Sequence, residues 1–465
     1  MFDLEQVSRI VDGSYSGRKV NCQLSGISTD SRHLTSGELF IPLRGDHFDG
    51  HDYLSQAVKR GAAACLSEEV VVGLSVPVIR VENTLRALGD IAAACRLQLN
   101  GPLIAITGSA GKTTTKEMLA TILEPVAPGL KTAGNFNNLI GLPLSLLRLE
   151  AKHQWAVLEM GTSAIGEIER LTEIAQPSIG IITNIGAAHL ETLQGLDGVS
   201  RAKGELYAGL HGGTAIINLD DPRVAQLPVA NGVKKVTYGV SPDAQVRAEK
   251  VTENQHGVYF ELILARQRYP VQLNIPGRHN VSNALAAAAA AFEIQVPVEK
   301  IVSGLTQFSS VSGRLDLSPL DGGGLLLDDS YNSNPLSAAA ALDALGVLSG
   351  SGRCVAVLGD MLELGETSKL MHEELGAKAA QVADVMIGVG GFAPDLCRGA
   401  MAAGMTSEQL IEAADVAEAI EYLDENRRPG DKILVKGSRG VHLEQLVDIL
   451  KATVGTPPNE TKGSA

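Results

Sequence analysis

The fold is decided by residues 103–116, which read LIAITGSAGKTTTK. The apolar run at 103–107 predicts a strand that is buried on both faces, and a helix is expected over residues 116–123. A glycine-rich loop between a strand and a helix turns backbone N–H groups inward, and the helix N-terminus adds partial positive charge. These features together predict a loop that binds the triphosphate of ATP.

The polar residues of this loop have predicted roles. Lys112 is expected to follow the β- and γ-phosphates, and the hydroxyl of Thr113 is expected to ligate Mg²⁺. The widespread form of the loop has glycine five residues before the glycine of the GK pair, where this sequence has Ile106. The loop is therefore the shorter TGxxGKT variety. Its nucleotide-binding residues are predicted to be Gly108, Ser109, Ala110, Gly111, Lys112, Thr113 and Thr114.

The segments around the loop alternate between strands and helices, which favours a doubly wound α/β sheet with parallel strands. Further buried strands are expected at 155–158, 179–183 and 214–217, with helical stretches between them. Residues 258–263 and 269–275 alternate in the manner of antiparallel strands, and a helix is expected at 283–292. The central part of the chain is therefore predicted to be an α/β nucleotide-binding domain.

A chain of 465 residues, at about 150 residues per domain, favours three domains. We therefore expect one further α/β unit on each side of the central domain. The first unit has predicted strands at 37–43 and 76–81 and helices at 53–60 and 85–97. The third has predicted strands at 325–327, 355–358, 385–389 and 433–435, separated by helices. The predicted domains are 1–97, 98–313 and 314–455, followed by a polar tail at 456–465 that is expected to be disordered.

The composition argues against several classes of protein. A formal net charge of −14 disfavours nucleic-acid binding, because a polyanion selects basic surfaces. The longest apolar run, residues 284–292, is far shorter than the ~20 residues of a membrane helix, and the acidic N-terminus does not resemble a signal peptide. Five widely spaced cysteines form no CxxC pair, so we expect all five to be buried structural residues in a reducing cytosol. The chain is therefore expected to be soluble and cytoplasmic.

Three residues outside the loop are candidates for metal binding or catalysis. Glu159 ends the strand at 155–158, and a phosphate loop usually needs an acidic magnesium ligand at the end of a neighbouring strand. His189 follows the strand at 179–183, where ligands bind in open α/β sheets, although a lone histidine is more often structural. Lys203 looks, from composition alone, like an ordinary exposed lysine on a helix.

Several segments together resemble the Mur ligase family, whose members use ATP to form amide bonds in the peptidoglycan stem peptide. The resemblance spans residues from about 26 to 440 and is far more specific than the phosphate loop alone. Its other segments are GNFNNLIGLPL at 134–144, EMG at 159–161, TNIGAAHLE at 183–191, AKGE at 202–205, GRHNVSNALAA at 277–287 and SGR at 312–314.

Three further segments are similar to the family member that acts last in the cytoplasm: residues 30–53, DDSYNSNPLS at 328–337 and LGDMLELG at 358–365. That member joins D-alanyl-D-alanine to UDP-N-acetylmuramoyl-tripeptide through an acyl phosphate and forms ADP. The resemblance implies a small N-terminal α/β domain that binds UDP, a central parallel-sheet P-loop ATPase domain and a C-terminal Rossmann-like α/β domain. It also implies a monomer that acts without nucleic acid or membrane insertion.

The resemblance further implies roles for individual residues. The expected catalytic residues are Lys112, Glu159, His189 and Lys203, and the expected magnesium ligands are Thr113, Glu159, His189 and a carbamylated Lys203. The expected nucleotide contacts are Asn280, Asn283, Arg314 and Asp329. The UDP-sugar side is expected to include Ser31, Arg32, Asn135, Asn137, Asn138 and Thr162, and the dipeptide side Asn332, Ser333, Asp360, Lys436 and Ser438. A carbamate is chemically reasonable because a lysine ammonium cannot ligate a cation, whereas a carbamate offers two oxygens.

Two alternatives remain open. A sibling ligase, such as a folate polyglutamate ligase or an enzyme that adds one amino acid to UDP-muramoyl peptides, would share the phosphate loop. Residues 30–53 argue against the folate enzyme, which needs no UDP site. A non-catalytic nucleotide switch would bind ATP without peptide-dependent turnover, and the segments AHLE and AKGE weigh against it because a switch has no evident need for a second metal site.

Overall fold

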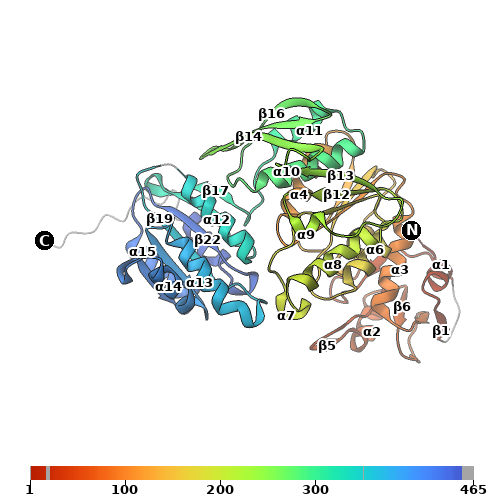
Figure 1. Ribbon diagram of the computed structural model, residues 1–465. Coiled ribbons are helices and arrows are strands. Elements are labelled where there is room, and N and C mark those ends of the chain that lie inside the picture. Colours follow the sequence, from red (N-terminus) through yellow and green to blue (C-terminus); the bar gives the residue numbers. More distant parts are fainter. Residues whose placement is uncertain (1, 17–20, 349, 453–465) are drawn as a thin grey trace.

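A computed structural model describes residues 2–16, 21–348 and 350–452, and the predicted tail at 456–465 lies outside these ranges. Figure 1 shows three α/β domains in chain order, each with helices packed against a sheet, and the third domain (blue) stands to one side of the other two. The positions of the domain boundaries remain a prediction. None of the described helices has the length and apolar character needed to span a membrane.

The first sheet has five strands in the order β1-β7-β6-β3-β2; β1 pairs antiparallel with β7, and the other neighbours are parallel. The strands are β1 (Ser14–Ser16), β2 (Gly26–Ser28), β3 (Glu38–Phe40), β6 (Ala64–Ser67) and β7 (Val78–Arg80), and β4 (Arg44–Gly45) pairs with β5 (Phe48–Asp49). The helices are α1 (Leu4–Ile10), α2 (Leu54–Lys59) and α3 (Thr84–Arg96). The strands predicted at 37–43 and 76–81 are confirmed at shorter lengths, and the helices predicted at 53–60 and 85–97 are confirmed to within one residue at each end.

The second sheet has nine strands in the order β16-β15-β14-β13-β12-β11-β8-β10-β9. Neighbours from β9 to β14 are parallel, and β14, β15 and β16 are antiparallel, as the sequence predicts for the last two. The strands are β8 (Leu103–Thr107), β9 (Gly129–Lys131), β10 (Trp155–Glu159), β11 (Ile179–Ile182), β12 (Thr214–Asn218), β13 (Lys234–Gly239), β14 (Val246–Asn254), β15 (Gly257–Leu264) and β16 (Gln267–Leu273). The helices are α4 (Lys112–Leu123), α5 (Gly141–Leu146), α6 (Glu167–Ala175), α7 (Leu190–Leu193), α8 (Leu196–Ala208), α9 (Pro222–Ala225), α10 (Asn280–Glu293) and α11 (Val298–Gln307).

Helix α4 begins at Lys112, earlier than the predicted start at 116. The threonines that follow Lys112 are β-branched and lower the helix propensity, which hides the true start in the sequence. Thr113 and Thr115 are nevertheless buried, so tertiary contacts decide the conformation. Helix α10 packs against α4, and its residues 284–291, which are alanines except for Leu285, are all buried. This packing fixes the start of α4 on the sheet.

The third sheet has six strands in the order β17-β18-β22-β19-β20-β21, all parallel except β17. The strands are β17 (Asp316–Pro319), β18 (Leu325–Asp329), β19 (Cys354–Gly359), β20 (Val385–Val389), β21 (Leu410–Ala413) and β22 (Lys432–Lys436). The helices are α12 (Pro335–Val347), α13 (Ser368–Ala379), α14 (Ala393–Ala402), α15 (Val416–Asn426) and α16 (Glu444–Ala452). All four strands predicted in this part of the chain are confirmed.

The expectation that all five cysteines are buried is wrong for two of them. Cys65, Cys354 and Cys397 are buried, whereas Cys22 and Cys95 are partly exposed. Cys95 lies in the last turn of α3 and Cys22 in the segment that precedes β2, so both meet solvent at the rim of a small core.

A buried histidine fixes the loop that follows β19. His372 on α13 is fully buried, and its Nδ1–H donates to the carbonyl of Ser368 at 2.6 Å. Its Nε2 accepts a hydrogen bond of 2.9 Å from the N–H of Met361, and its ring stacks on Phe392. Both ring nitrogens are thereby assigned as in the neutral imidazole, and burial lowers the pKa of His372 below its usual range.

This arrangement predicts a dependence of stability on pH. The pKa of a histidine in the unfolded chain is about 6.5, so the contribution of His372 is complete above that pH and is lost as the pH falls toward the lower pKa of the folded state. Between about pH 7 and about pH 5 we expect the Tm of the wild-type protein to fall more steeply than the Tm of His372→Gln. Exposed His211 provides the control, since His211→Gln should keep the wild-type slope. Equal slopes for all three proteins would contradict the assignment.

Candidate functional site

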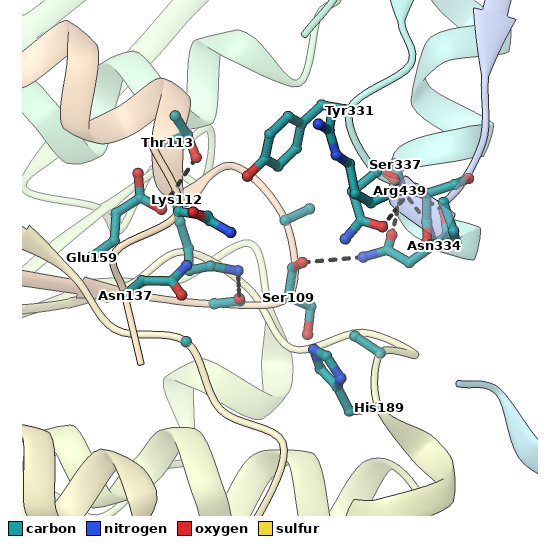
Figure 2. A pocket seen from close by; sticks show the side chains of 18 of the residues that line it. Ser109, Lys112, Thr113, Asn137, Glu159, His189, Tyr331, Asn334, Ser337 and Arg439 are labelled. Carbon is teal, nitrogen blue, oxygen red and sulfur yellow. Dashed lines mark hydrogen bonds between the residues drawn. The ribbon is translucent and has the colours of Figure 1, made fainter. Parts of the chain in front are cut away.

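A cavity of about 520 Å³ lies where the second and third domains meet. Its walls come from the carboxyl ends of parallel strands: the loop after β8, the end of β10, the segment after β11, and the ends of β18 and β22. Ligands bind at such strand ends in open α/β sheets. Figure 2 shows that side chains from both domains point into this space.

The phosphate loop leaves β8 with two glycines that no other residue could replace. Gly108 has φ 149°, and an added Cβ would lie 1.8 Å from Oγ1 of Thr183. Gly111 has φ 80°, and an added Cβ would lie 2.3 Å from Oδ1 of Asn283. Both conformations belong to glycine, and both contacts would be severe clashes for a larger residue. The predicted glycines are therefore fixed by backbone geometry and by packing.

The loop is held from behind by the segment that follows β11. The N–H of Ala110 donates to Oδ1 of Asn184 at 2.8 Å, and the carbonyl of Ala110 accepts from the hydroxyl of Thr183 at 2.6 Å. The hydroxyl of Ser109 donates to the carbonyl of Gly186 at 2.9 Å. The loop conformation is thus set before a nucleotide arrives. Sequence reasoning did not assign a role to Asn184, although it lies in a segment that carries the family resemblance.

Lys112 curls back over this loop, and its ammonium donates to the carbonyl of Gly108 at 2.7 Å (Figure 2). Burial lowers the pKa of Lys112 to about 8, a shift that nearby Glu159 opposes and Arg314 increases. A phosphate group would supply the counter-charge that the ammonium lacks here. The lysine is therefore placed as the sequence predicts, at the mouth of the loop.

Glu159 and Thr113 form a pair of oxygen donors beneath the loop. Both are buried, and the Thr113 hydroxyl donates to Oε2 of Glu159 at 3.2 Å (Figure 2). Oε1 of Glu159 is buried without a hydrogen bond and has Lys116 Nζ at 3.3 Å as its ionic neighbour. A carboxylate oxygen and a hydroxyl are the hard donors that magnesium prefers, so these residues fit the ion.

Lys203 is buried, which corrects its interpretation as an exposed helical lysine. It lies on the face of α8 that also buries Val199 and Leu206, because residues three and four apart share one side of a helix. Among the residues that the structure describes, no hydrogen bond or ion pair satisfies its side chain. Burial, together with the positive charge of Lys112, lowers the pKa of Lys203 well below its usual range.

His189 stands on the opposite rim of the cavity at the start of α7. Its Nδ1 contacts the carboxylate of Glu363, which belongs to the third domain. Burial lowers the pKa of His189, and the Glu363 carboxylate opposes this shift. Within the described part of the chain, no group of three or more His, Cys, Asp or Glu residues could hold a metal ion, so a metal beside His189 needs a further ligand such as a modified Lys203.

A buried ion pair connects the third sheet to the cavity. Asp329 and Lys436 are aligned by the pairing of β18 with β22, and the ammonium lies 2.5 Å from the carboxylate. The Asp329 carboxylate also accepts a hydrogen bond of 3.1 Å from the N–H of Leu315. Arg314 lies 4.4 Å above the ring of Tyr331, and both residues line the cavity.

Most of the predicted site residues line this one cavity. They are Gly108, Ser109, Ala110, Gly111, Lys112, Thr113, Asn135, Asn137, Asn138, Glu159, Thr162, His189, Lys203, Arg314, Asp329, Asn332, Ser333, Lys436 and Ser438. Thr114, Asn280, Asn283, Ser31, Arg32 and Asp360 do not line it. Their predicted roles, like those of the lining residues, remain predictions.

The predicted residues that do not line the cavity make their contacts elsewhere, except that Asn283 packs against Gly111 of the phosphate loop. Asn280 and Asn283 are buried at the start of α10 and are joined by a hydrogen bond of 2.9 Å. Arg32 in the first domain pairs with Asp30. The Asp360 carboxylate instead accepts the backbone N–H groups of 391 and 392 before α14.

Sequence reasoning missed a direct contact between the two domains at the phosphate loop. Asn334 starts α12, and its Nδ2 donates to the carbonyl of Ser109 at 3.1 Å (Figure 2). The segment DDSYNSNP carries part of the family resemblance, but the sequence predicts roles only for Asp329, Asn332 and Ser333 within it. The capping pattern of Asn334, with Pro335 after it, was the available signal for a helix start at this point.

The buried pair of Asp329 and Lys436 predicts a large stability effect. Lys436→Met would leave the Asp329 carboxylate buried without its counter-charge, so the free energy of unfolding in urea should fall by about 3 kcal/mol. The double variant Asp329→Leu/Lys436→Met should recover part of this loss, because no lone charge is left. Lys378→Met is the control, since its partner Asp343 is exposed and the pair should contribute little. A wild-type stability for Lys436→Met would contradict the analysis.

Comparisons with known protein families match most of the chain. The Mur ligase family catalytic domain matches residues 23–96, the Mur ligase middle domain matches residues 106–291, and the Mur ligase glutamate ligase domain matches residues 313–439. A UDP-N-acetylmuramoyl-tripeptide–D-alanyl-D-alanine ligase from Escherichia coli is 37% identical and is aligned over 96% of this chain and 98% of its own length.

Solved structures are similar over the same extent. The structure of MurF from Acinetobacter baumannii matches with a TM-score of 0.89 at 35% identity, covering 96% of this chain and 98% of that one. A MurF ligase from Thermotoga maritima, solved in complex with ADP, matches with a TM-score of 0.82 at 27% identity, covering 92% of this chain and 97% of that one.

Proposed function

The chain belongs to the Mur ligase family, and we propose that it joins D-alanyl-D-alanine to UDP-N-acetylmuramoyl-tripeptide with hydrolysis of ATP to ADP and phosphate. The similar ligase from Escherichia coli carries this activity in its name, and the similarity extends over nearly the full length of both chains. The reaction belongs to the synthesis of peptidoglycan precursors. We further propose that the protein works in the cytoplasm as a monomer and that its partners are these two substrates and ATP.

One observation carries the proposal most directly. A single cavity combines a preformed phosphate loop, the buried Glu159 oxygen without a hydrogen bond and the buried, unpartnered Lys203. Polar side chains of the third domain complete its lining. A nucleotide switch needs the loop but has no evident use for the other features. A ligase that must hold a nucleotide, a carboxylate and an amine together needs all of them.

In the first step, the terminal carboxylate of the tripeptide attacks the γ-phosphorus of ATP. The bond from the γ-phosphorus to the bridging oxygen breaks, ADP leaves, and an acyl phosphate forms. Lys112 and the backbone N–H groups of the loop stabilise the negative charge on the transferred phosphoryl group. Their placement before ATP binds lowers the cost of reorganisation during the reaction.

The metal-binding residues would be Thr113 and Glu159 for one ion and His189 with a carbamylated Lys203 for a second. Bound Mg²⁺ supplies charge neutralisation at the phosphate oxygens. The buried Oε1 of Glu159 and the unpaired side chain of Lys203 support this assignment. A lysine with a lowered pKa is more readily neutral, and the neutral amine is the form that reacts with CO₂.

In the second step, the free amine of D-alanyl-D-alanine attacks the acyl carbon, and a tetrahedral oxyanion forms before phosphate leaves. The proposed contacts for the dipeptide lie on the third domain, at Asn332, Ser333, Lys436 and Ser438. These residues line the cavity opposite the phosphate loop, so docking of the third domain brings the amine toward the acyl phosphate and excludes water.

The proposed function is tested by product mass and phosphate release. Purified protein with ATP, Mg²⁺, UDP-N-acetylmuramoyl-tripeptide and D-alanyl-D-alanine should yield the pentapeptide product and one phosphate per product. Single amino acids in place of the dipeptide should release little phosphate, whereas a sibling ligase would prefer them. Lys112→Met should lower turnover at least about a hundredfold with an unchanged Tm, because the variant loses charge stabilisation at the phosphoryl group. ATP hydrolysis without an amide product would contradict the proposal.

The carbamate on Lys203 has a separate test. Lys203→Ala should lose most of the activity, because the metal site loses an anionic ligand, and added short carboxylates such as acetate should restore part of it. Lys59→Ala is a matched control on an exposed helical lysine and should respond to neither change. Native-protein ¹³C NMR after exposure to ¹³CO₂ should give a carbamate signal in the wild type that is missing from Lys203→Ala. Full activity of Lys203→Ala would contradict the role.

A further inference from the structure

Glu363 of the third domain meets His189 of the second domain at the edge of the cavity. The Glu363 carboxylate contacts Nδ1 of the imidazole, and the Glu363 carbonyl accepts a hydrogen bond of 3.3 Å from the N–H of Glu191. The side chain of Glu363 is 57% exposed, so burial in a core does not determine its position. The contact therefore has to be explained by what it does for His189.

Both partners of this contact hold unfavourable backbone conformations. His189 has φ 52° and Glu363 has φ 65°, and both values lie in the left-handed region that residues with a Cβ atom seldom adopt. Such conformations persist only where the surrounding structure maintains them, and they gather at functional sites. Two such conformations that face each other across a domain junction indicate that the contact between His189 and Glu363 has a function.

The loop that carries Glu363 is anchored firmly to its own domain. The N–H of Met361 donates to His372, and the N–H of Leu362 donates to Oγ of Ser438 at 3.0 Å. The carbonyl of Asp360 accepts from the N–H of Ser438 at 3.0 Å. Glu363 is therefore expected to move together with the third domain.

We infer that Glu363 is a positioning residue for His189, whose orientation as a metal ligand is completed only when the third domain docks. Nδ1 of His189 is buried and makes no hydrogen bond to the described residues, so the contact brings the Glu363 carboxylate to a nitrogen that still needs a partner. A small rotation that lets the carboxylate accept from Nδ1–H would fix the tautomer of the imidazole and leave Nε2 as the free lone pair for a metal. The inference rests on the proposed function, because that function makes His189 a magnesium ligand. It adds that the metal site on the second domain takes its final form from a side chain of the third.

This arrangement links two events that the reaction needs at the same time. The third domain brings residues for the amine substrate, and the same movement brings the Glu363 carboxylate to His189. Metal binding on the His189 side and docking of the third domain then favour each other, because each stabilises the same arrangement. Activation of the carboxylate is thereby coupled to the presence of the domain that supplies the amine.

The test is the affinity for Mn²⁺, followed by electron paramagnetic resonance in the presence of a non-hydrolysable ATP analogue, with the analogue alone as background. Glu363→Ala should weaken Mn²⁺ binding about tenfold or more, the usual effect of removing a carboxylate that orients a metal-bound histidine. Glu363→Gln should weaken it less, because the amide oxygen still accepts from Nδ1–H. Glu366→Gln, on the same loop and exposed, removes the same charge and should bind Mn²⁺ as the wild type does.

Two results would overturn the inference: wild-type Mn²⁺ affinity in Glu363→Ala, or tighter binding, which would show that Glu363 occupies the place of the ion. His189→Ala separates this failure from a failure of the proposed function, because His189 is the ligand that Glu363 is inferred to position. If His189→Ala loses Mn²⁺ and Glu363→Ala does not, the metal site at His189 stands and only the role of Glu363 is wrong. If wild type and His189→Ala bind Mn²⁺ alike, the proposed metal site at His189 is itself wrong, and the role of Glu363 fails with it.

Discussion

The phosphate loop depends on the hydrogen bonds that Thr183 and Asn184 make to Ala110 from behind. A loop rich in small residues has many conformations of similar energy, and fixing each residue costs about 1–2 kcal/mol of conformational entropy. The segment after β11 meets that cost during folding, so the backbone N–H groups are already arranged when a triphosphate binds. The alignment of β8 with β11, in which Thr107 pairs with Ile182, places this support directly beside the loop.

The charged side chains in the cavity come from several strand ends that meet at this place. Lys112 and Arg314 bring positive charge to a protein whose net charge is −14, and Glu159 and Asp329 offset it locally. An anionic nucleotide is thus attracted by a small concentration of cations rather than by the whole surface. Burial makes each of these groups sensitive to its neighbours, since the low dielectric of the interior strengthens every charge interaction.

Much of the central domain could be predicted from the sequence. The run at 103–107, the glycines of the loop and the acid at 159 carry local signals, because strand burial, backbone conformation and strand ends are all encoded in short segments. The burial of Lys203 is different, since a lysine on a helix gives no sign of which side faces the core until the helix is packed. Glu363 and Asn334 could not be predicted as contacts of the second domain, because those contacts depend on how two domains dock and not on either sequence segment alone.

The alanine-rich helix α10 has a consequence far from any substrate. Its methyl groups let α10 lie close against α4, the helix that starts at the end of the phosphate loop. Enlarging one of those alanines to valine would push two backbones apart, at a typical cost of about 1–3 kcal/mol for an overfilled interior. Missense alleles that permit growth only at low temperature should therefore collect in residues 284–291, although not one of those side chains reaches the cavity.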